Sequence, residues 1–416
     1  MINLPKAFLS VKDASIELPF IEHSIKQKIL LDLAKRIIEN KKSILKNNEE
    51  DLKKLDKQDP KYDRLLLNDS RLNAMSEALE KIAQFDSPIW KTIEEYTLAN
   101  GLKFQKKTVP LGVVGIIYES RPNVTLEAFA LCFMSSNACV LKGGSEAKNS
   151  NEIFVRLAHA SLEQFLAPKT CVFLMPPDRE TVKTLLQAKG IVDVIIPRGS
   201  QALIDFVKQN SEIPIIETGA GVVHTYFDSS ADREKGKRII TNAKTRRVSV
   251  CNALDCLLIH QERLSDLPFL VSDLKAKGVL LLADDSAYSV LRNSYPEQLL
   301  FKAQPSDYGK EFLSLKLAIK TVVDLSDALK HIRHYSSQHS EAIIAEDEKV
   351  VLQFFERVDA AVVYSNASTA FTDGGEFGMG GEIGISTQKL HVRGPFSLQH
   401  LVSTKWLVEG DGQVRK

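Results

Sequence analysis

The chain begins with a helical pattern of apolar residues and later changes to short apolar runs. Across residues 21–58, apolar side chains recur every three or four positions among lysines and glutamates, which predicts a long amphipathic helix. A second helical run follows Asp69-Ser70 and ends near Phe85. From Glu95 to Thr108 the pattern becomes strand-like on both sides of Asn100-Gly101. Asn-Gly is the preferred pair for a type I′ turn, so we predict a β-hairpin there.

From residue 113 onward, short apolar runs alternate with helical stretches. Strands are predicted at 113–117, 138–141, 171–175, 192–196 and 213–216, and helices around 124–135, 150–166, 179–188 and 200–209. Continuous apolar strands separated by helices indicate a parallel sheet covered on both faces, which binds ligands at the carboxyl ends of its strands. A second α/β unit begins near residue 221, with strands predicted at 257–259, 279–282, 317–323, 360–364 and 404–408.

Composition and charge narrow the class of protein. A hydrophobic fraction of 44% and a charged fraction of 26% are typical of a globular chain, and 416 residues suggest two or three domains. A net charge of +1 favours neither nucleic acid nor an anionic membrane as a partner. The five cysteines are odd in number and lack the spacing of a metal site, so we expect free thiols, no metal and a cytoplasmic location. We expect about four of the five to be buried, since free cysteines behave as small hydrophobic residues.

Three loops at the predicted strand ends could bind a dinucleotide, although the G-x-G-x-x-G fingerprint is absent. They are Glu119–Asn123, Lys142–Glu146 and Pro197–Ser200. Small residues let backbone N–H groups approach a pyrophosphate, and a helix N-terminus favours anions. The competing interpretation is that Gly and Ser only form turns. Lys142 is either a solvated lysine or, with Ser145 nearby, a partner for the extra phosphate of NADP.

A candidate nucleophile lies in the segment Ser249–Ala253, just before an apolar run. The Cys251 thiolate would attack an acyl group or an aldehyde. Lys244, Arg246 and Arg247 bring positive charge close in sequence, which would activate a thiol or hold an anionic substrate. The residues alone leave open a buried, inert cysteine beside a solvated basic run.

Six segments resemble those of one known family, in order along the chain. They are VPLGVVGIIYESRPNV at 109–124, LKGGSEA at 141–147, IIPRGS at 195–200, ETGAGVVH at 217–224, NAKTRRVSVCNALD at 242–255 and FGMGGEIGISTQKLHVRGP at 377–395. They are similar to the glutamate-5-semialdehyde dehydrogenase (gamma-glutamyl phosphate reductase) family, within the aldehyde dehydrogenase superfamily. Two departures are Asp255, where the family usually has glutamate, and Arg246-Arg247-Val248, where it often has Gln-Arg-Pro.

The resemblance implies an α/β fold of the aldehyde dehydrogenase type. It implies a Rossmann-type cofactor domain, an α/β catalytic domain and a small oligomerisation hairpin. The expected parts are an N-terminal helical part of the cofactor domain at 1–93, the hairpin at 94–112, the NADP-binding domain at 113–220, the catalytic domain at 221–385 and a C-terminal segment with an oligomerisation strand at 386–416.

The resemblance also assigns roles to individual residues. Cys251 matches the catalytic cysteine, and Asn123 matches the amide that would hold the oxyanion together with the Cys251 N–H, rather than a simple turn residue. Glu217 matches a general-base glutamate, although it could instead orient the nicotinamide, hold the cysteine or be a plain strand-end residue. The cofactor-binding candidates are Ser120, Lys142, Gly143, Ser145, Arg198, Gly199, Ser200 and Glu311. The substrate-binding candidates are Arg121, Arg246, Lys389, His391 and Arg393, of which His391 could also be a packed histidine.

The activity that follows from the resemblance is NADPH-dependent reduction of L-glutamyl 5-phosphate to L-glutamate 5-semialdehyde and phosphate, in proline biosynthesis. The resemblance implies a homodimer or higher homo-oligomer, and it suggests an association with glutamate 5-kinase. One rival is a hydrolysing NAD-dependent aldehyde dehydrogenase, which needs no phosphate. Another is a catalytically dead binding protein that keeps the fold, which intact Cys251, Asn123 and Glu217 argue against.

Overall fold

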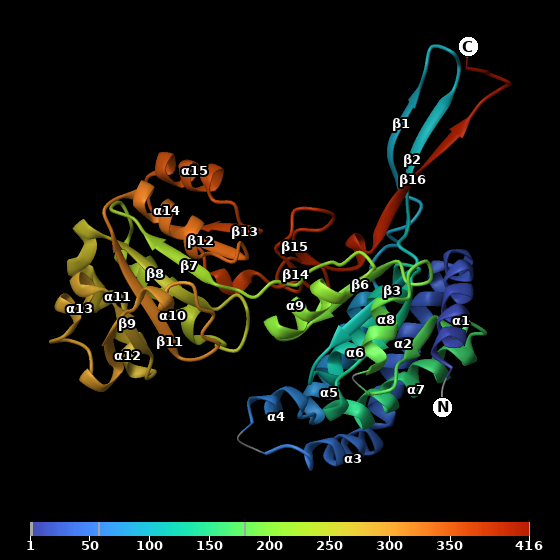
Figure 1. Ribbon diagram of the computed structural model, residues 1–416, viewed down its shortest axis with the longest axis horizontal. Helices are drawn as coiled ribbons and strands as arrows, with labels where there is room; N and C mark the ends of the chain where they lie inside the picture. The colour runs from blue at the N-terminus through green and yellow to red at the C-terminus, as the bar shows by residue number, and fades with distance from the viewer. Residues whose placement is uncertain (1–2, 57–58, 179, 416) are drawn as a thin grey trace. The chain divides into compact units, whose positions relative to one another are not determined.

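The structure is a computed structural model that describes residues 3–56, 59–178 and 180–415, and it divides into two units. Unit 1 consists of Met1–Thr218, Gly378–Gly384 and Phe396–Lys416, and unit 2 of Gly219–Phe377 and Ile385–Pro395. Both are mixed α/β structures (Figure 1). No helix along the described residues has the length and apolar character needed to cross a membrane.

Unit 1 contains a four-stranded parallel sheet with the order β5-β4-β3-β6. Its strands are β3 (Val113–Tyr118), β4 (Ala138–Lys142), β5 (Val172–Leu174) and β6 (Val194–Arg198). Every residue of β3 and β4 is buried, as their continuous apolar sequences predict. The run 213–216 forms only an isolated bridge between Ile195 and Ile215. The helices of this unit are α1 (Leu4–Glu17), α2 (His23–Glu39), α3 (Lys41–Leu52), α4 (Pro60–Leu65), α5 (Asp69–Ala83), α6 (Pro122–Met134), α7 (Lys148–Gln164), α8 (Glu180–Leu186) and α9 (Gln201–Asn210).

The predicted long helix at 21–58 forms as two helices, α2 and α3, divided at Asn40; α3 ends at Leu52, and positions 57–58 of the prediction lie outside the described residues. The Asn40 backbone N–H and side-chain amide both donate to the Arg36 carbonyl, at 3.0 and 2.8 Å, at the end of α2. Helix α5 starts where its sequence suggests, because the Asn68 side chain accepts the Arg71 N–H at 2.8 Å.

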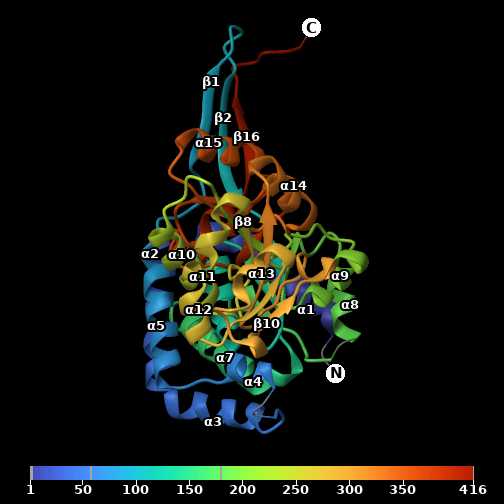
Figure 2. The same ribbon diagram turned by 90° about the vertical axis from the view of Figure 1, so that its left-hand side faces the viewer.

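The hairpin forms, but its turn is not type I′. Strands β1 (Thr92–Thr97) and β2 (Lys103–Pro110) are antiparallel, and Leu98 N–H donates to the Leu102 carbonyl at 2.9 Å. Of the Asn-Gly pair only Gly101 has a positive φ, of 88°. The loop therefore has three residues with glycine in the left-handed position. The third strand, β16 (Val402–Glu409), pairs with β2, and the three strands lie side by side in Figures 1 and 2.

Unit 2 contains a seven-stranded parallel sheet with the order β10-β9-β11-β8-β7-β12-β13. Helices α10–α13 pack on one face, around Phe227 and Leu257, and α14 and α15 pack on the other, around Tyr226 and Leu258. The strands are β7 (Val223–Phe227), β8 (Leu254–His260), β9 (Leu280–Ala283), β10 (Leu300–Lys302), β11 (Lys316–Val322), β12 (Ser340–Ile344) and β13 (Val362–Ser365). The helices are α10 (Arg233–Thr245), α11 (Leu267–Leu270), α12 (Ser272–Ala276), α13 (Asp285–Leu291), α14 (Leu325–Tyr335) and α15 (Glu348–Arg357). Strands β14 (Gly384–Ser386) and β15 (Gly394–Phe396) form a separate pair.

Candidate active site

The strand order of unit 1 identifies where its sheet can bind a ligand. The chain runs from β3 outward through β4 to β5 and then returns to place β6 on the other side of β3. Parallel α/β sheets bind ligands at such a reversal, outside the carboxyl ends of the strands. The loops after β3 and β6 flank this reversal, and both contain predicted site residues.

Ser120, a predicted cofactor residue after β3, is held in a strained conformation. Its φ is 36°, in the left-handed region that few residues other than glycine adopt, and its side chain is buried. The Ser120 N–H donates to the Glu146 carboxylate at 2.9 Å, and the Ser120 hydroxyl donates to the same oxygen. The loops after β3 and β4 are therefore joined by Glu146.

Lys142 is not a solvated lysine. It ends β4 with only 4% of its surface exposed, and its ammonium donates to the Pro177 and Gly143 carbonyls at 3.1 and 3.2 Å. Burial lowers the pKa of Lys142, and Asp178 and Glu146 oppose that shift. A side chain on Gly143 would overlap Asn151 and Tyr118, so the backbone there must be bare. Ser145 begins a short turn directly after these glycines.

The loop after β6 is engaged by acidic residues. Ser200, at the start of α9, donates its N–H and its hydroxyl to Glu119 at 2.8 and 3.1 Å. The adjacent Gly199 packs against the same carboxylate. Arg198 pairs with Glu382 at 3.1 Å, and both side chains are largely buried. Ser200 can therefore receive a phosphate only after Glu119 turns away.

The two predicted catalytic residues of unit 1 are placed differently. Asn123 is exposed in the first turn of α6, where the positive end of the helix dipole lies. Arg121 is the residue that precedes this helix. Glu217 lies in the irregular segment after α9, and its carboxylate pairs with the Lys208 ammonium at 2.9 Å.

Cys251 lies in unit 2, in the turn between α10 and β8, and its side chain is partly exposed. The turn is anchored by Asn252, whose side-chain amide donates to the Thr372 carbonyl at 2.9 Å. The Thr369 hydroxyl donates to the Asn252 carbonyl, also at 2.9 Å. Gly221 lies against the turn so closely that a Cβ atom there would be 1.5 Å from the Cys251 carbonyl oxygen.

A buried ion pair lies beneath the Cys251 turn. The Lys244 ammonium is fully buried, 2.7 Å from the Leu254 carbonyl and 3.7 Å from the Asp255 carboxylate. Asp255 accepts the Phe312 N–H at 3.1 Å, and the neighbouring Glu311 accepts the Gly221 N–H at 3.0 Å. Lys244 is therefore part of the scaffold that holds residues 221 and 311, and it does not face a substrate. Burial raises the pKa of Asp255, and Lys244 opposes that shift.

The predicted substrate cations form two groups within unit 2. Arg246 follows α10 and is exposed. Lys389 and Arg393 both pair with Asp359, at 2.6 and 2.8 Å, and these bonds hold the pKa of Asp359 below its usual value. The Nε and Nη2 atoms of Arg393 are buried and have no hydrogen-bond partner among the residues that the structure describes. His391 is exposed, with a φ of 61°.

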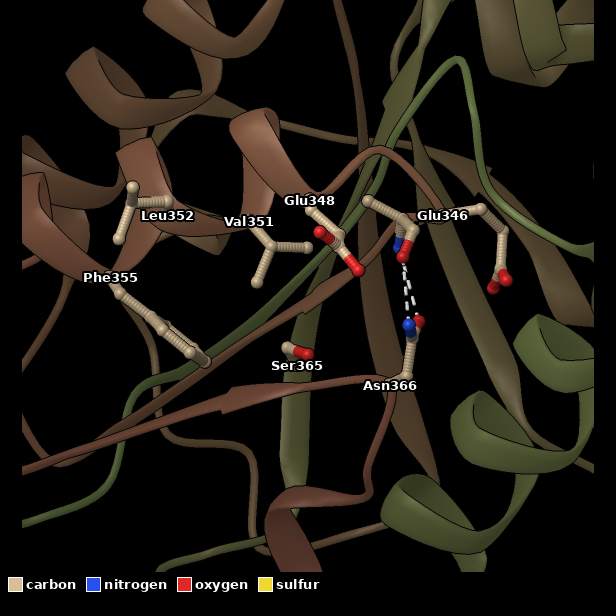
Figure 3. Close-up of a pocket in the computed structure, with 8 residues that line it drawn as sticks. Glu346, Glu348, Val351, Leu352, Phe355, Ser365 and Asn366 are labelled. Atoms are coloured by element: carbon tan, nitrogen blue, oxygen red, sulfur yellow. Dashed lines mark hydrogen bonds between the residues drawn. The ribbon is translucent and has the colours of Figure 1, made fainter.

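A pocket of unit 2 lies apart from every predicted site residue. It is found at the carboxyl ends of β12 and β13, where Asn366 exchanges hydrogen bonds with the Ala345 backbone at 2.7 and 3.1 Å. Figure 3 shows Leu352 and Phe355 of α15 on its other side. Its lining is Ala345, Glu346, Glu348, Val351, Leu352, Phe355, Ser365 and Asn366.

Known proteins resemble this chain over nearly its whole length, although no family model matches it. A gamma-glutamyl phosphate reductase of Pelodictyon phaeoclathratiforme is 53% identical over 413 residues, covering 99% of both chains. One from Legionella pneumophila is 54% identical over 404 residues, covering 97% of both chains. The crystal structure of gamma-glutamyl phosphate reductase from Thermotoga maritima is 36% identical, with a TM-score of 0.95 and complete coverage of both chains.

The chain belongs to the gamma-glutamyl phosphate reductase family. An acetylating aldehyde dehydrogenase from Geobacillus thermoglucosidasius is 18% identical, with a TM-score of 0.71 over 99% of this chain and 97% of its own. That likeness shows that the fold is of the aldehyde dehydrogenase type. The resemblance stated from the six sequence segments is thus confirmed for both the family and the fold.

Within this gamma-glutamyl phosphate reductase family member, burial separates Cys251 from the other thiols. Cys132, Cys139, Cys171 and Cys256 are buried, and Cys251 is partly exposed. The expected four core cysteines are confirmed. A thiol must be accessible to react, so Cys251 is the one suited to chemistry.

Two contributors to the site were missed from the sequence. Glu146 lies in a quoted segment, but its partner Ser120 is 26 residues earlier and nothing local links them. Asp359 precedes Lys389 by 30 residues and lies in no quoted segment. Both residues are carboxylates whose partners are distant in sequence. Hydrophobic periodicity does not indicate such contacts.

Proposed function

We propose that this chain reduces L-glutamyl 5-phosphate to L-glutamate 5-semialdehyde and phosphate, with NADPH, through a thioester on Cys251. The structural observation that carries the chemistry is the accessibility of Cys251 alone among the five cysteines. Cysteine thiolates are the intrinsically strong nucleophiles among side chains and form acyl intermediates. The family supplies the substrate class.

In the first step the Cys251 thiolate attacks the acyl carbon, and the carbon–oxygen bond to phosphate breaks. The developing oxyanion accepts hydrogen bonds from the Asn123 amide and the Cys251 N–H. One such donor contributes about 10²–10³ in rate. After hydride transfer to the thioester carbon, the carbon–sulfur bond breaks, the aldehyde leaves and the thiolate is restored.

The cofactor is proposed to bind unit 1, where the loops after β3, β4 and β6 meet the strand ends. Lys142 supplies positive charge at the end of β4, and the backbone N–H groups of Gly143 and Gly144 are the proposed donors to a phosphate. Ser120, Ser145, Arg198, Gly199 and Ser200 belong to these loops and are proposed cofactor ligands, and Glu311 is the proposed ligand of the ribose. When bound, NADPH supplies the hydride.

We predict that Lys142→Ala weakens NADPH binding more than NADH binding. Two of its three N–H donors are used by the Pro177 and Gly143 carbonyls, and the third is assigned to the 2′-phosphate. A hydrogen bond to a charged group contributes about 1.5–3 kcal/mol, so we expect roughly a 10- to 150-fold rise in the NADPH dissociation constant. Fluorescence titration with both cofactors measures it.

The matched control is Lys148→Ala. Lys148 opens α7 a few residues later and is half-exposed, 3.9 Å from Glu152. It should change neither dissociation constant. Equal weakening of NADH and NADPH by Lys142→Ala would reject the 2′-phosphate assignment.

The α-carboxylate of the substrate is assigned to Arg393, with Arg121, Arg246, Lys389 and His391 as further candidates. Asp359 pairs with Nη1 of Arg393, and the Nε and Nη2 donors, which have no partner among the described residues, form the edge that binds carboxylates in a bidentate manner. We predict that Arg393→Lys raises KM for glutamyl phosphate about tenfold with kcat retained, because a lysine pairs with Asp359 but cannot form the fork. Steady-state kinetics measure KM and kcat separately, and a fall in kcat with KM unchanged would contradict this role.

Glu217 is assigned a positioning role, in which it orients the nicotinamide or holds Cys251, in place of a role as general base. Its carboxylate is engaged by Lys208, and a reductase of an acyl phosphate must keep water away from the thioester. The rival hydrolysing dehydrogenase would use Glu217 as its base.

The reaction run in reverse distinguishes these functions. With glutamate 5-semialdehyde and NADP, the purified chain should form NADPH only when inorganic phosphate is added, because phosphate must attack the thioester. Equal rates with and without phosphate would establish hydrolysis and assign the base to Glu217. No NADPH in either case would establish the inactive binding protein.

We also propose that the sheet β1-β2-β16 joins two or more copies of this chain. Tyr96, Phe104 and Trp406 form an aromatic cluster on this sheet, and Tyr96 and Trp406 are 40% and 43% exposed. A three-stranded sheet with exposed aromatic rings is typical of an interface. A monomer mass by light scattering would reject this. The association with glutamate 5-kinase stays a prediction.

A further inference from the structure

Three side chains with metal-binding atoms meet inside unit 2, on the sheet face covered by α14. His224 of β7 and Cys256 of β8 are direct partners across neighbouring strands, and both are fully buried. His331 comes from α14, and its Nε2 atom lies 3.7 Å from the Cys256 sulfur. One ligand atom from each of the three lies within 4.8 Å of the others. None of these residues has a part in the proposed reaction.

The orientation of His224 is fixed by a buried carboxylate. Glu341 is the partner of His224 on the next strand, β12. One Glu341 oxygen accepts the His224 N–H at 2.8 Å and lies 3.2 Å from Nδ1 of the ring, and the other accepts the Ser336 hydroxyl. When Nδ1 donates to this carboxylate, Nε2 is left with the lone pair. Metal-bound histidines show this arrangement, with the second ring nitrogen donating to a carboxylate.

The Nε2 atom of His224 is buried and has no hydrogen-bond partner in the described part of the chain. Leaving such an atom unsatisfied costs about 1–3 kcal/mol, and the great majority of buried polar atoms do have partners. A cation beside Nε2 would satisfy it and would also explain why a histidine ring and a thiol are directed toward it.

The spacing of the three atoms fits a tetrahedral ion. Zinc bonds of about 2.0–2.1 Å to nitrogen and 2.3 Å to sulfur place ligand atoms roughly 3.4–3.8 Å apart. The separation of 3.7 Å between the Cys256 sulfur and the His331 Nε2 atom is already in this range. The other two distances between ligand atoms are at most 4.8 Å, so these atoms need to move by only about 1 Å to reach it.

We propose that His224, Cys256 and His331 bind Zn²⁺, with Glu341 holding His224 in the ligating form. Imidazole and thiolate are the ligands that zinc prefers over the oxygen-binding cations. On binding, the Cys256 thiol releases its proton to solvent and forms the zinc–sulfur bond. The thiolate and the Glu341 carboxylate together balance the two positive charges. Since the three residues join β7, β8 and α14, the ion stabilises this part of unit 2.

The test is a zinc titration of the full chain after dialysis against a chelator, with a competing chromophoric chelator as the reporter. The wild type and Cys251→Ser should each bind one Zn²⁺ per chain, which excludes the reactive thiol as the ligand. Cys256→Ser should bind at least about 100-fold more weakly. Cys171→Ser, which changes another buried thiol, should bind as the wild type does.

Glu341→Gln is a second variant that leaves all three ligands intact. Losing a carboxylate partner of a ligating histidine typically costs 10- to 100-fold in metal affinity, and we expect a loss in that range. Co²⁺ in place of zinc should give a thiolate-to-metal absorption band in the wild type that disappears in Cys256→Ser. A wild type without stoichiometric zinc, or a Cys256→Ser variant that binds zinc and shows the band unchanged, would overturn the proposal.

Discussion

Cys251→Ala should fold, bind NADPH and lose turnover by more than about 10⁴-fold, as removal of a nucleophile does in enzymes with covalent intermediates. The side chain is partly exposed in a turn whose anchors are contributed by Asn252 and Thr369, so its removal leaves the scaffold intact. NADPH oxidation with glutamyl phosphate measures turnover, and fluorescence titration measures cofactor binding.

The control for this variant is Cys171→Ala, which removes a buried thiol of unit 1. It should lower the melting temperature and keep its specific activity. Thiol labelling adds a direct readout, because a thiol reagent should modify Cys251 first in the wild type and react far more slowly with Cys251→Ala. Normal turnover by Cys251→Ala would end the thioester mechanism.

Gly221→Ala should be the most damaging substitution of a single small group outside the nucleophile itself. The added Cβ would lie 1.5 Å from the Cys251 carbonyl oxygen, where a van der Waals contact needs more than twice that distance. The obstacle is backbone, so the Cys251 turn itself must move. A displacement of 1 Å in a reacting group costs about 10²-fold, and we expect at least that loss in kcat. Steady-state kinetics and the rate of Cys251 labelling measure it.

Gly278→Ala separates overlap from a general loss of stability. Gly278 is in the same unit with a φ of 70°, and a Cβ there meets nothing within 4 Å. An alanine in that conformation costs about 1–2 kcal/mol through backbone strain alone. It should lower the melting temperature and leave kcat unchanged. If Gly221→Ala also lowers the melting temperature and leaves kcat unchanged, as Gly278→Ala should, the close approach of Gly221 to Cys251 does not position the nucleophile.

Two strands with continuous apolar sequences were predicted, two strands with buried polar residues were missed, and the apolar run 213–216 forms only an isolated bridge. β3 and β4 read as continuous hydrophobic runs and were placed within a residue or so of their ends. β7 and β12 were missed, since they carry His224, Thr225, Ser340 and Glu341 in the interior. Hydrophobic periodicity assumes that buried positions are apolar, and the proposed zinc cluster breaks that assumption in the middle of the sheet.

The site was predictable only as far as sequence resemblance identified it. Cys251 by itself was one thiol among five, and its exposure came from the tertiary structure. The pairs Ser200–Glu119 and Lys389–Asp359 join residues that are 81 and 30 positions apart. Such partners are chosen by the fold, and the same residues alone are equally compatible with solvated surface.

The sheet β1-β2-β16 also has a consequence for how the protein is made. β16 completes a sheet whose other strands lie about 290 residues earlier. At a synthesis rate of about 5–20 residues per second, the finished hairpin waits roughly 15–60 s on the ribosome for its third strand. During that time β2 presents an open edge, which invites pairing with other nascent chains. Lys103, Lys106 and Lys107 place positive charge on β2, and charged side chains of this kind disfavour pairing at an open edge.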